Sequence, residues 1–333
     1  MPVIGSGIPE TRMQDALTGT KNVKAMSESQ NATVLISSKS GRLGNRLFQS
    51  AHFMGSSLAH GYRLLNPSLD EYAPFLQGSR QDPLCCTPSC FPCGDPEFAA
   101  QLRTMALRVS EILVPAAAMV RPQAVRILDI RESHDAVGAS YNMSNPDFLG
   151  LLQPGGLVAM RGWSFSDHPN LARFRPQILR YHAPTDPIAA AARLAVNRAK
   201  EASGMVIGVH IRQEDYRFWK GGIHYYEVED YARWMRSCAE VWSDADPVFL
   251  ICSSNEIDPA PFRGIRTVRG PGFPMGDLHA LSLCDRIIGP PSTFSQWASY
   301  SGNIPLCILE SKAMEISPAA FRSHSGCAGL PRR

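Results

Sequence analysis

In the second half of the chain, short apolar runs of strand length alternate with longer segments whose apolar residues recur at helical spacing. Apolar runs of this length are typical of buried strands, and their alternation with helices is typical of a parallel sheet. We therefore predict an α/β fold for this half. The predicted strands are 205–212, 247–254, 265–270, 286–288 and 304–310, and the predicted helices are 188–202, 228–242, 276–284 and a segment that follows 290–295.

The first half shows the same alternation less regularly. An apolar run at 34–37 predicts a strand, and a glycine-containing loop then leads into a segment of helical periodicity. Asn45 is the expected N-cap of that helix and Gly61 its expected C-terminal glycine. Further strands are predicted at 62–69, 125–130 and 155–165, and further helices at 97–112 and 171–181.

The chain has 333 residues, a length that favours two domains. The segment 183–187 contains two prolines that interrupt helical structure, which makes it the expected linker. Residues 1–31 lack a sustained period and are expected to be a disordered leader. The predicted division is 1–31 leader, 32–185 first α/β domain, 186–310 second α/β domain and 311–333 peripheral tail.

The net charge of +3 is too small to favour nucleic acid as the main partner. No apolar run approaches about 18 residues, so no membrane-spanning helix is expected. The N-terminus lacks a basic start followed by an apolar core, and so does not resemble a signal peptide. We expect a cytoplasmic protein, with peripheral association at a membrane as the alternative.

Four of the nine cysteines lie close together in the segment CCTPSCFPCG, at Cys85, Cys86, Cys90 and Cys93. Four thiols within so short a segment could bind zinc or an iron–sulfur cluster. Their spacing is not that of paired CxxC motifs, however, and the segment is rich in proline. A loop with reduced thiols, or with one local disulfide, is the alternative that we favour over a metal site.

The stretch MVIGVHIRQEDY, residues 205–216, changes abruptly from apolar to charged. Its charged residues therefore follow a predicted strand, and ligands of open α/β sheets bind at the carboxyl ends of strands. Arg212 presents a planar set of donors suited to a phosphate or carboxylate. Glu214 and Asp215 could orient that arginine or accept a proton from a substrate. The alternative is a surface turn in which Arg212 pairs with Asp215.

Polar residues also follow the predicted strands that end at 252 and 288, and all three ends should lie on one edge of the sheet. After the last of them, Ser292, Thr293 and Ser295 precede a helix. Hydroxyls and free backbone N–H groups at a helix N-terminus suit a phosphate. With Arg212 nearby, a diphosphate could be held without a metal ion. A simple helix cap is the alternative.

The glycine loop of the first half, GRLGNR, spans 41–46 and places two arginines near a helix N-terminus. This arrangement would suit an anion or a polar sugar. A tight turn without a ligand is the alternative. The loop matches neither the dinucleotide fingerprint GxGxxG nor a P-loop.

Four segments of the chain, in order, resemble the motifs of glycosyltransferase family 11, the α-1,2-fucosyltransferases. GRLGNRLFQSA resembles that family's GGLGNQMFQYA, and RGWSFSDHPNLARFRPQI resembles its GYxQSxKYF segment. GVHIRQEDY resembles HxRRxDY, a motif shared with α-1,6- and protein O-fucosyltransferases. DLHALSLCDRIIGPPSTFSQWASY resembles the closing motif, which is close to DLxLMSxCxxxIxxNSTFSWWAAY. The four segments cover most of residues 34–310.

The resemblance implies a GT-B-like fold, in which two Rossmann-like domains with parallel sheets face each other across a cleft. It also implies an inverting transfer of fucose from GDP-fucose to a glycan hydroxyl, in an α-1,2 linkage to a galactoside, without metal or cofactor. The implied donor-binding residues are His210, Arg212, Asn255 (or its neighbour Glu256), Asp277, Ser292, Thr293, Phe294 and Ser295. The residues expected on the acceptor side of the cleft are Gly44, Asn45, Arg46 and Trp163.

The chain departs from these motifs in several places, including Gln296 at the position of the first tryptophan of the closing WW pair. Gln213 replaces the second arginine of HxRRxDY, and Glu214 replaces a small residue. Pro291 replaces the asparagine of the closing NST. Losing one cation should weaken the binding of a diphosphate, although related O-fucosyltransferases also lack that second arginine.

In the implied reaction, Arg212 and the helix N-terminus after Pro291 would stabilise charge on the departing β-phosphate. Asp215 and Glu214 are the candidate bases, and bracing of Arg212 is the equal alternative for either. Gln213 and Pro291 favour a second hypothesis, a non-catalytic protein that binds a GDP-sugar or glycan. A third is an unrelated nucleotide-binding enzyme with no preference for guanine. The sequence leaves the oligomeric state open.

Overall fold

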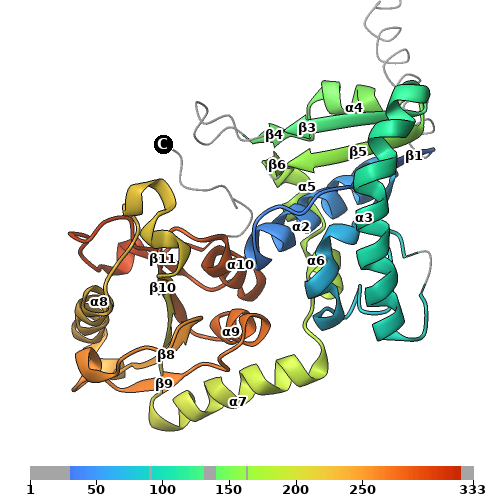
Figure 1. Ribbon diagram of the computed structural model, residues 1–333. Helices are drawn as coiled ribbons and strands as arrows, with labels where there is room; N and C mark the ends of the chain where they lie inside the picture. The colour runs from blue at the N-terminus through green and yellow to red at the C-terminus, as the bar shows by residue number, and fades with distance from the viewer. Residues whose placement is uncertain (1–30, 90–91, 131–139, 163, 324–333) are drawn as a thin grey trace, which may run out of the picture.

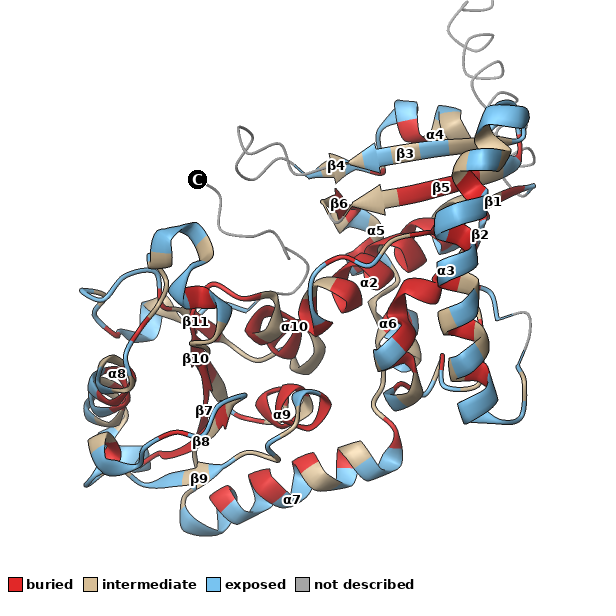
Figure 2. Cartoon of the chain, in the orientation of Figure 1, coloured by how far each residue is buried: buried red, intermediate tan, exposed pale blue. Residues whose placement is uncertain are grey.

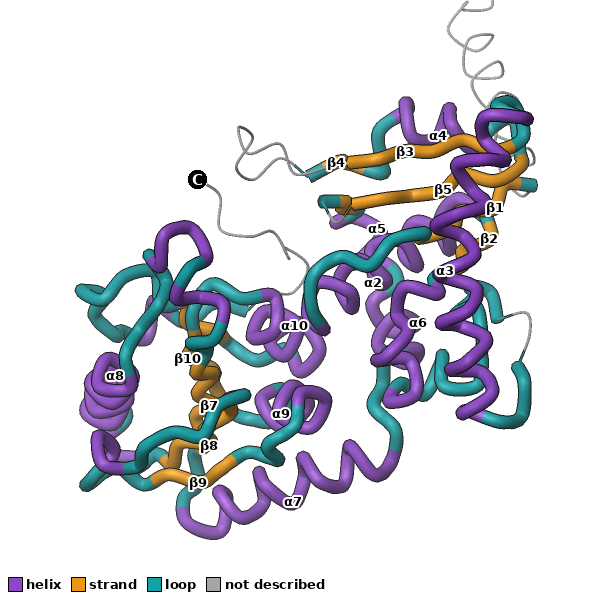
Figure 3. The backbone as a smooth tube through the Cα atoms, in the orientation of Figure 1, coloured by secondary structure: helices purple, strands orange, loops and turns teal. Residues whose placement is uncertain are grey.

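The computed structural model describes residues 31–89, 92–130, 140–162 and 164–323. It contains two larger parallel sheets, each covered by helices, and a small pair of strands beside the first sheet (Figure 1). We call residues 32–182 the first unit and residues 186–323 the second unit. The short connection between them joins α6 to α7 (Figure 3). The predicted α/β class with parallel sheets, GT-B-like, is confirmed.

The first unit is built on a four-stranded parallel sheet in the order β2-β1-β5-β3. In β1 the side chains alternate between two apolar surroundings: Val34 and Ile36 belong to the main core, whereas Leu35 packs with Val114 of α3. The strands are β1 (Ala32–Ile36), β2 (Arg63–Leu65), β3 (Val125–Ile130) and β5 (Gly156–Gly162), with β4 (Tyr141–Asn142) and β6 (Phe165–Ser166) forming the small pair. The helices are α2 (Leu43–His60), α3 (Pro96–Val120), α4 (Pro146–Leu152), α5 (His168–Arg173) and α6 (Arg175–Tyr181), with a 3₁₀ segment at Pro67–Phe75.

The second unit is built on a five-stranded sheet in the order β11-β10-β7-β8-β9, in which every described pairing is parallel. All six residues of the central strand β7 are buried, as expected for a parallel strand covered on both faces. The strands are β7 (Val206–Ile211), β8 (Val248–Ser253), β9 (Thr267–Arg269), β10 (Arg286–Gly289) and β11 (Leu306–Ile308). The helices are α7 (Asp186–Ala202), α8 (Val228–Val241), α9 (Pro274–Leu281) and α10 (Thr293–Gly302).

Helix α8 covers one face of the second sheet through its aromatic residues, which are buried (Figure 2). Residues 311–323, expected to be a peripheral tail, pack against this side of the unit. The indole N–H of Trp234 donates to the carbonyl oxygen of Met314 at 2.9 Å, and the rings of Trp242 and Phe321 lie 5.0 Å apart.

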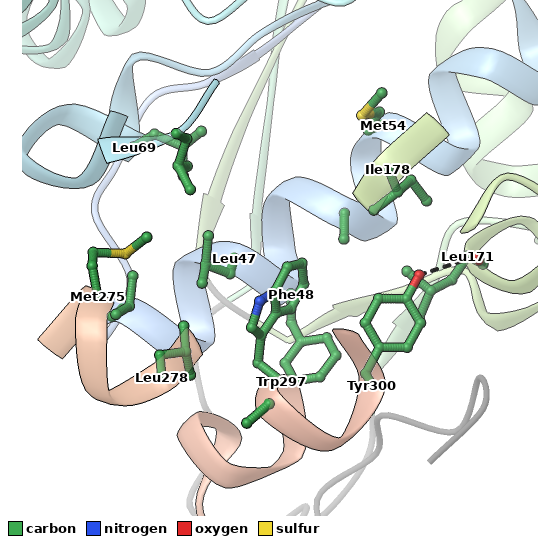
Figure 4. Packing of buried hydrophobic residues seen from close by; sticks show 14 of the residues in the cluster. Leu47, Phe48, Met54, Leu69, Leu171, Ile178, Met275, Leu278, Trp297 and Tyr300 are labelled. Atoms are coloured by element: carbon green, nitrogen blue, oxygen red, sulfur yellow. Dashed lines mark hydrogen bonds between the residues drawn. The ribbon is translucent and has the colours of Figure 1, made fainter. Parts of the chain in front are cut away.

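The two units share one continuous hydrophobic core. Helix α2 of the first unit packs against α9 and α10 of the second, where the rings of Phe48 and Trp297 lie nearly perpendicular with their centroids 5.1 Å apart (Figure 4). The same core reaches the inner faces of both sheets, including Ile36 and Leu250. The units are therefore joined by packed side chains and not only by the connecting segment.

Several predicted boundaries were wrong. The N-cap of α2 is Arg42, not Asn45, which lies in the first turn. Helix α3 continues past the predicted end at 112 to Val120, and the predicted helix 171–181 is divided at Phe174. Gly61 does adopt the left-handed conformation at the end of α2, with φ 77°.

Within the described residues, no helix is both long and apolar enough to cross a membrane. The predicted leader, apart from Asn31, lies outside the described residues, as do residues 324–333 of the predicted tail.

Candidate functional site

The carboxyl ends of the central strands of the second sheet lie side by side. Strands β7 and β8 are in register with Ile211 opposite Ser253, and β7 and β10 are in register with Val209 opposite Ile288. The segments that follow these strands therefore share one edge, as the sequence pattern predicted.

Arg212, directly after β7, is held by Asp215. Its Nη2 lies 2.8 Å from Oδ2 and 3.1 Å from Oδ1 of Asp215, and its Nε lies 3.2 Å from Oδ1. The guanidinium also lies over the ring of Tyr216, 4.8 Å from its centroid. Two contacts of this kind fix the orientation of the planar group, because one acts in its plane and the other on its face.

Glu214 holds a second arginine, which comes from the other unit. Arg42, at the start of α2, donates through Nη1 to Oε2 of Glu214 and lies 3.9 Å from Oδ1 of Asp215. The hydrogen bond from Arg42, followed by one from Ser254, holds the pKa of Glu214 below its usual range. The Arg42 side chain is 58% exposed, so more than half of its surface is open to solvent.

The two carboxylates are therefore engaged with arginines and are weak bases. Burial alone would raise the pKa of Asp215, but the hydrogen bond and charge of Arg212 and the charge of Arg42 outweigh it and lower the pKa. A general base is most effective when its pKa lies near the working pH. Of the two roles considered for Asp215 and Glu214, this geometry favours bracing of the arginines over proton transfer.

The N-terminus of α10 lies beside this cluster. The hydroxyl of Tyr216 donates to the carbonyl oxygen of Pro291, which ties the turn after β7 to the turn before α10. Ser292 caps the helix by accepting from the backbone N–H of Phe294 at 3.2 Å, and Ser295 donates to the carbonyl oxygen of Ser292 at 3.2 Å. Both hydroxyls therefore form hydrogen bonds with the protein backbone, as expected for a simple helix cap. An anion at this site would interact with the positive end of the helix dipole.

His210 is buried behind the cluster, at the end of β7. Its ring lies 4.7 Å from that of Phe294, and its Nδ1 has no hydrogen-bond partner within the described part of the chain. Burial lowers the pKa of His210 to about 3, so the imidazole is neutral at physiological pH. It can offer a neutral donor or acceptor but no charge.

The glycine loop of the first unit meets the α10 turn directly. A Cβ at Gly44 would lie 2.6 Å from the backbone nitrogen of Phe294, which leaves room only for glycine. Thr293 donates to Oδ1 of Asn45 at 2.6 Å. The structure thus brings Gly44 and Asn45 together with the predicted donor residues and uses them as contacts between the units.

Arg46 is engaged elsewhere. It is buried and donates to the carbonyl oxygen of Gly41 at 3.2 Å. Its guanidinium also forms an ion pair with Glu71 at 3.2 Å and lies over the ring of Tyr72. Its guanidinium therefore shapes the loop from within the first unit. Trp163, the remaining predicted acceptor-side residue, lies outside the described residues.

The other two predicted donor residues lie at the same edge but differ in their surroundings. Asp277, in the first turn of α9, is buried and accepts from the backbone N–H of Gly272 at 2.8 Å. Burial raises the pKa of Asp277 to about 6. Asn255 follows β8 and is exposed, and only its backbone has a described contact, to Ser253.

No group of three or more potential metal ligands comes together in the part of the chain that the structure describes. Within the cysteine-rich segment, Cys85 is buried, and burial raises the pKa of its thiol to about 12. A thiol that stays protonated is a poor metal ligand. Cys90 lies outside the described residues.

A cavity of about 340 Å³ lies between the units near the connecting segment, and none of the predicted site residues lines it. Its walls include Leu47, His182 and Leu278. The candidate site is therefore identified by its charged groups at the sheet edge and not by this cavity.

Arg42 is the residue that the sequence prediction missed. The glycine loop had been noted for its two arginines, but nothing in the local pattern placed one of them beside Glu214, 172 positions away. The sequence does hold one signal for this contact, because both residues differ from the family motifs. Arg42 stands where the motif has a glycine, and Glu214 stands where the motif has a small residue.

No protein-family model matches the chain, and no curated protein matches it either. Solved structures do match. A mutant of FUT1 from Arabidopsis thaliana in complex with GDP is 14% identical, with a TM-score of 0.55 over 91% of this chain and 77% of that one. This similarity shows a shared fold.

Two further matches have lower scores. POFUT1 in complex with GDP is 13% identical, with a TM-score of 0.45 over 82% of this chain and 95% of that one. The fucosyltransferase NodZ from Bradyrhizobium is 13% identical, with a TM-score of 0.46 over 84% of this chain and 96% of that one.

Proposed function

We propose that this protein is a fucosyltransferase that transfers fucose from GDP-fucose to a hydroxyl group of a glycan. The observation that carries the proposal is the pairing of Arg212 with Asp215 beside the N-terminus of α10. This cluster occupies the carboxyl edge of a parallel sheet, in a fold shared with a FUT1 protein that was solved with GDP.

In this proposal the diphosphate lies between the guanidinium of Arg212 and the start of α10. Both supply positive electrostatic potential at a point where negative charge develops as GDP departs. Asp215 holds Arg212 in place before the nucleotide arrives, so that little reorganisation is needed on binding. Asp277 and the exposed segment after β8 are expected near the nucleoside.

The finer parts of the proposal come from the resemblance alone. They are inversion at the fucose carbon, an α-1,2 linkage to a galactoside, and independence from metal. Because Asp215 and Glu214 are weak bases, we propose that neither takes the proton of the acceptor hydroxyl, and that their task is to orient arginines.

Binding of nucleotides tests the donor site. We would titrate GDP and GDP-fucose into the protein by calorimetry without divalent metal, with GDP-mannose and UDP as controls. Loss of a charge-assisted contact removes about 2 kcal/mol, so Arg212→Ala should weaken GDP binding by roughly thirtyfold. Arg63→Ala, at an exposed position of β2, is the matched control and should bind as the wild type does. Failure of the wild-type protein to bind GDP would refute the proposal.

A second candidate is a protein that binds a GDP-sugar without transferring it. It is favoured by Gln213, whose amide donates to the carbonyl oxygen of Tyr226 at 3.1 Å and so supplies no cation to the cluster. Release of GDP from GDP-fucose in the presence of galactoside acceptors, with and without EDTA, separates the two candidates and tests the independence from metal.

A further inference from the structure

Arg42 stands on the first unit, yet its side chain ends at the carboxylates of the second. It is the N-cap of α2, and its extended backbone, with φ −99° and ψ −170°, directs it away from the helix. Through Nη1 it contacts Glu214 and approaches Asp215, the residue that holds Arg212. Two guanidinium groups, one from each unit, therefore share a pair of adjacent carboxylates.

The described contacts of Arg42 leave most of its donors unused. A guanidinium has five N–H donors in a planar arrangement, and the ion pairs of Arg42 engage only Nη1. Its side chain is also much more exposed than that of Arg212, at 58% against 17%. A ligand between the units can thus reach Arg42 while Glu214 still holds it.

We infer that Arg42 binds the diphosphate of the nucleotide and supplies the cation that is missing at Gln213. This inference rests on the proposed function. Gln213 itself is turned toward the carbonyl oxygen of Tyr226. Glu214 is then a positioning residue for Arg42, just as Asp215 is for Arg212. Nucleotide binding would draw on both units, because one arginine of the phosphate site belongs to each.

The test compares GDP with guanosine, which lacks phosphate. Arg42→Ala should weaken GDP binding about tenfold or more and leave guanosine binding unchanged, since only the phosphate contact is lost. Arg42→Lys should retain part of the affinity. Adding Gln213→Arg to Arg42→Ala should restore part of it, and Arg63→Ala serves as the control.

The outcomes are distinct. If Arg212→Ala loses GDP but Arg42→Ala does not, the inference is wrong and the proposed function stands. Equal losses for GDP and guanosine in Arg42→Ala would show a structural role for Arg42 and also overturn the inference. If the wild type binds no GDP, both the proposed function and the inference fail.

A second inference follows independently from the outer face of α3. This helix buries Leu107 and Val114 against the first unit, but its opposite face is also apolar. Ile112 is 72% exposed and Met119 is 85% exposed, and Arg108 and Glu111 are exposed on the same helix. The exposed large apolar residues of the helix are Phe98, Met105, Val109, Ile112, Leu113, Met119 and Val120, which we call the α3 face.

A helix that exposes a row of large apolar side chains opposite its buried face is normally covered by a neighbour. At 25 residues, α3 is about 37 Å long, and packing along that length buries roughly 600–800 Å² on each partner, close to a standard interface. The face is not a basic surface suited to an anionic membrane, because Arg108 is offset by Glu111.

We propose that the α3 face binds the α3 face of a second copy of this chain, with the helices antiparallel. An antiparallel arrangement centred near Val109 places the end that carries Glu97 beside the end that carries Arg121, whereas a parallel one would place like charges together. It also brings Met105 opposite Leu113. Helix α3 lies on the side of the first unit away from the second unit, so the candidate site of each copy would remain open (Figure 1).

Sedimentation equilibrium of the full chain tests this proposal. The wild type should be dimeric at tens of micromolar, and Ile112→Glu should be monomeric and still folded by circular dichroism. The matched control is Leu194→Glu, at a single exposed leucine of α7, which should stay dimeric. A Val109→Cys variant should form an intermolecular disulfide on oxidation, and Leu194→Cys should not. A monomeric wild type, as would occur if another segment covered the face, overturns the proposal.

Discussion

Asp215 and Glu214 each hold one arginine, and an experiment can distinguish this bracing role from a role in proton transfer. Asp215→Asn keeps an oxygen that can accept from Arg212 but loses the charge that fixes it. We expect the variant to bind GDP less tightly, by roughly tenfold, because Arg212 is less firmly oriented.

Proton transfer would give a different pattern in the same variant. Loss of a general base removes turnover by a factor of about a hundred or more while leaving GDP binding intact. Calorimetry together with the rate of GDP release distinguishes the two patterns. An unchanged GDP affinity with a large loss of turnover would contradict the bracing role.

Asp277 gives a prediction about stability and pH. Its pKa is raised by burial to about 6 in the folded state, above the unfolded value of 3.8, so ionisation opposes folding. Stability is therefore lost as pH rises from about 4 to about 6 and does not return above that range. Asp277→Asn removes this effect and should stabilise the protein at pH 7.5 by about 1–2 kcal/mol, with no gain at pH 4. Urea denaturation at the two pH values checks this, and equal effects at both would contradict it.

At the level of elements, the approach of α2 to α10 depends on Gly44. An added methyl group would meet the backbone of Thr293 and Phe294 at 2.6 Å, and backbone cannot turn aside as a side chain can. We expect Gly44→Ala to destabilise the protein by about 2 kcal/mol or more and to weaken GDP binding, because the helices are pushed apart.

Gly150 in α4 provides the matched control. Nothing lies within 4 Å of its added methyl group, so Gly150→Ala should stabilise the protein by about 0.5–1 kcal/mol. Thermal unfolding measures both variants, and a neutral Gly44→Ala would show that the helices can separate.

Most strands of the second sheet were predictable because they contain short apolar runs, and the three polar ends were correctly placed on one edge. The N-cap of α2 could not be predicted from the sequence, because Asn45 is a residue type favoured at N-caps whereas arginine, the observed residue at position 42, is not. Asn45 instead meets Thr293, 248 positions away, a contact that no local pattern encodes. The same holds for Arg42 and Glu214, and so for half of the charged cluster.

The whole molecule should be sensitive to acid. The pKa of His52 and of His182 is lowered by burial to about 4, and that of His210 to about 3, whereas unfolded histidine titrates near 6.5. Protons therefore bind the unfolded state preferentially, so the stability that these three histidines contribute is fully present above about pH 6.5 and is lost as pH falls toward 4.

At pH 5, each of the three histidines lowers the free energy of unfolding by about 2 kcal/mol. This loss exceeds the free energy of unfolding that protonation of Asp277 restores. The melting temperature should be lower by about 5–10 °C at pH 5 than at pH 7.5. Calorimetry at the two pH values tests this, and an unchanged melting temperature would show that these imidazoles are protonated in the folded state.

The core that runs from the first sheet through α2, α9 and α10 to the second also determines how the chain should exchange its amide hydrogens (Figure 4). Because neither unit can expose its side of that core without disturbing the other, slow exchange should extend through both as one cooperative block. A nucleotide held at the edge of the second sheet would then also protect amides in β1 and β5, strands of the other unit.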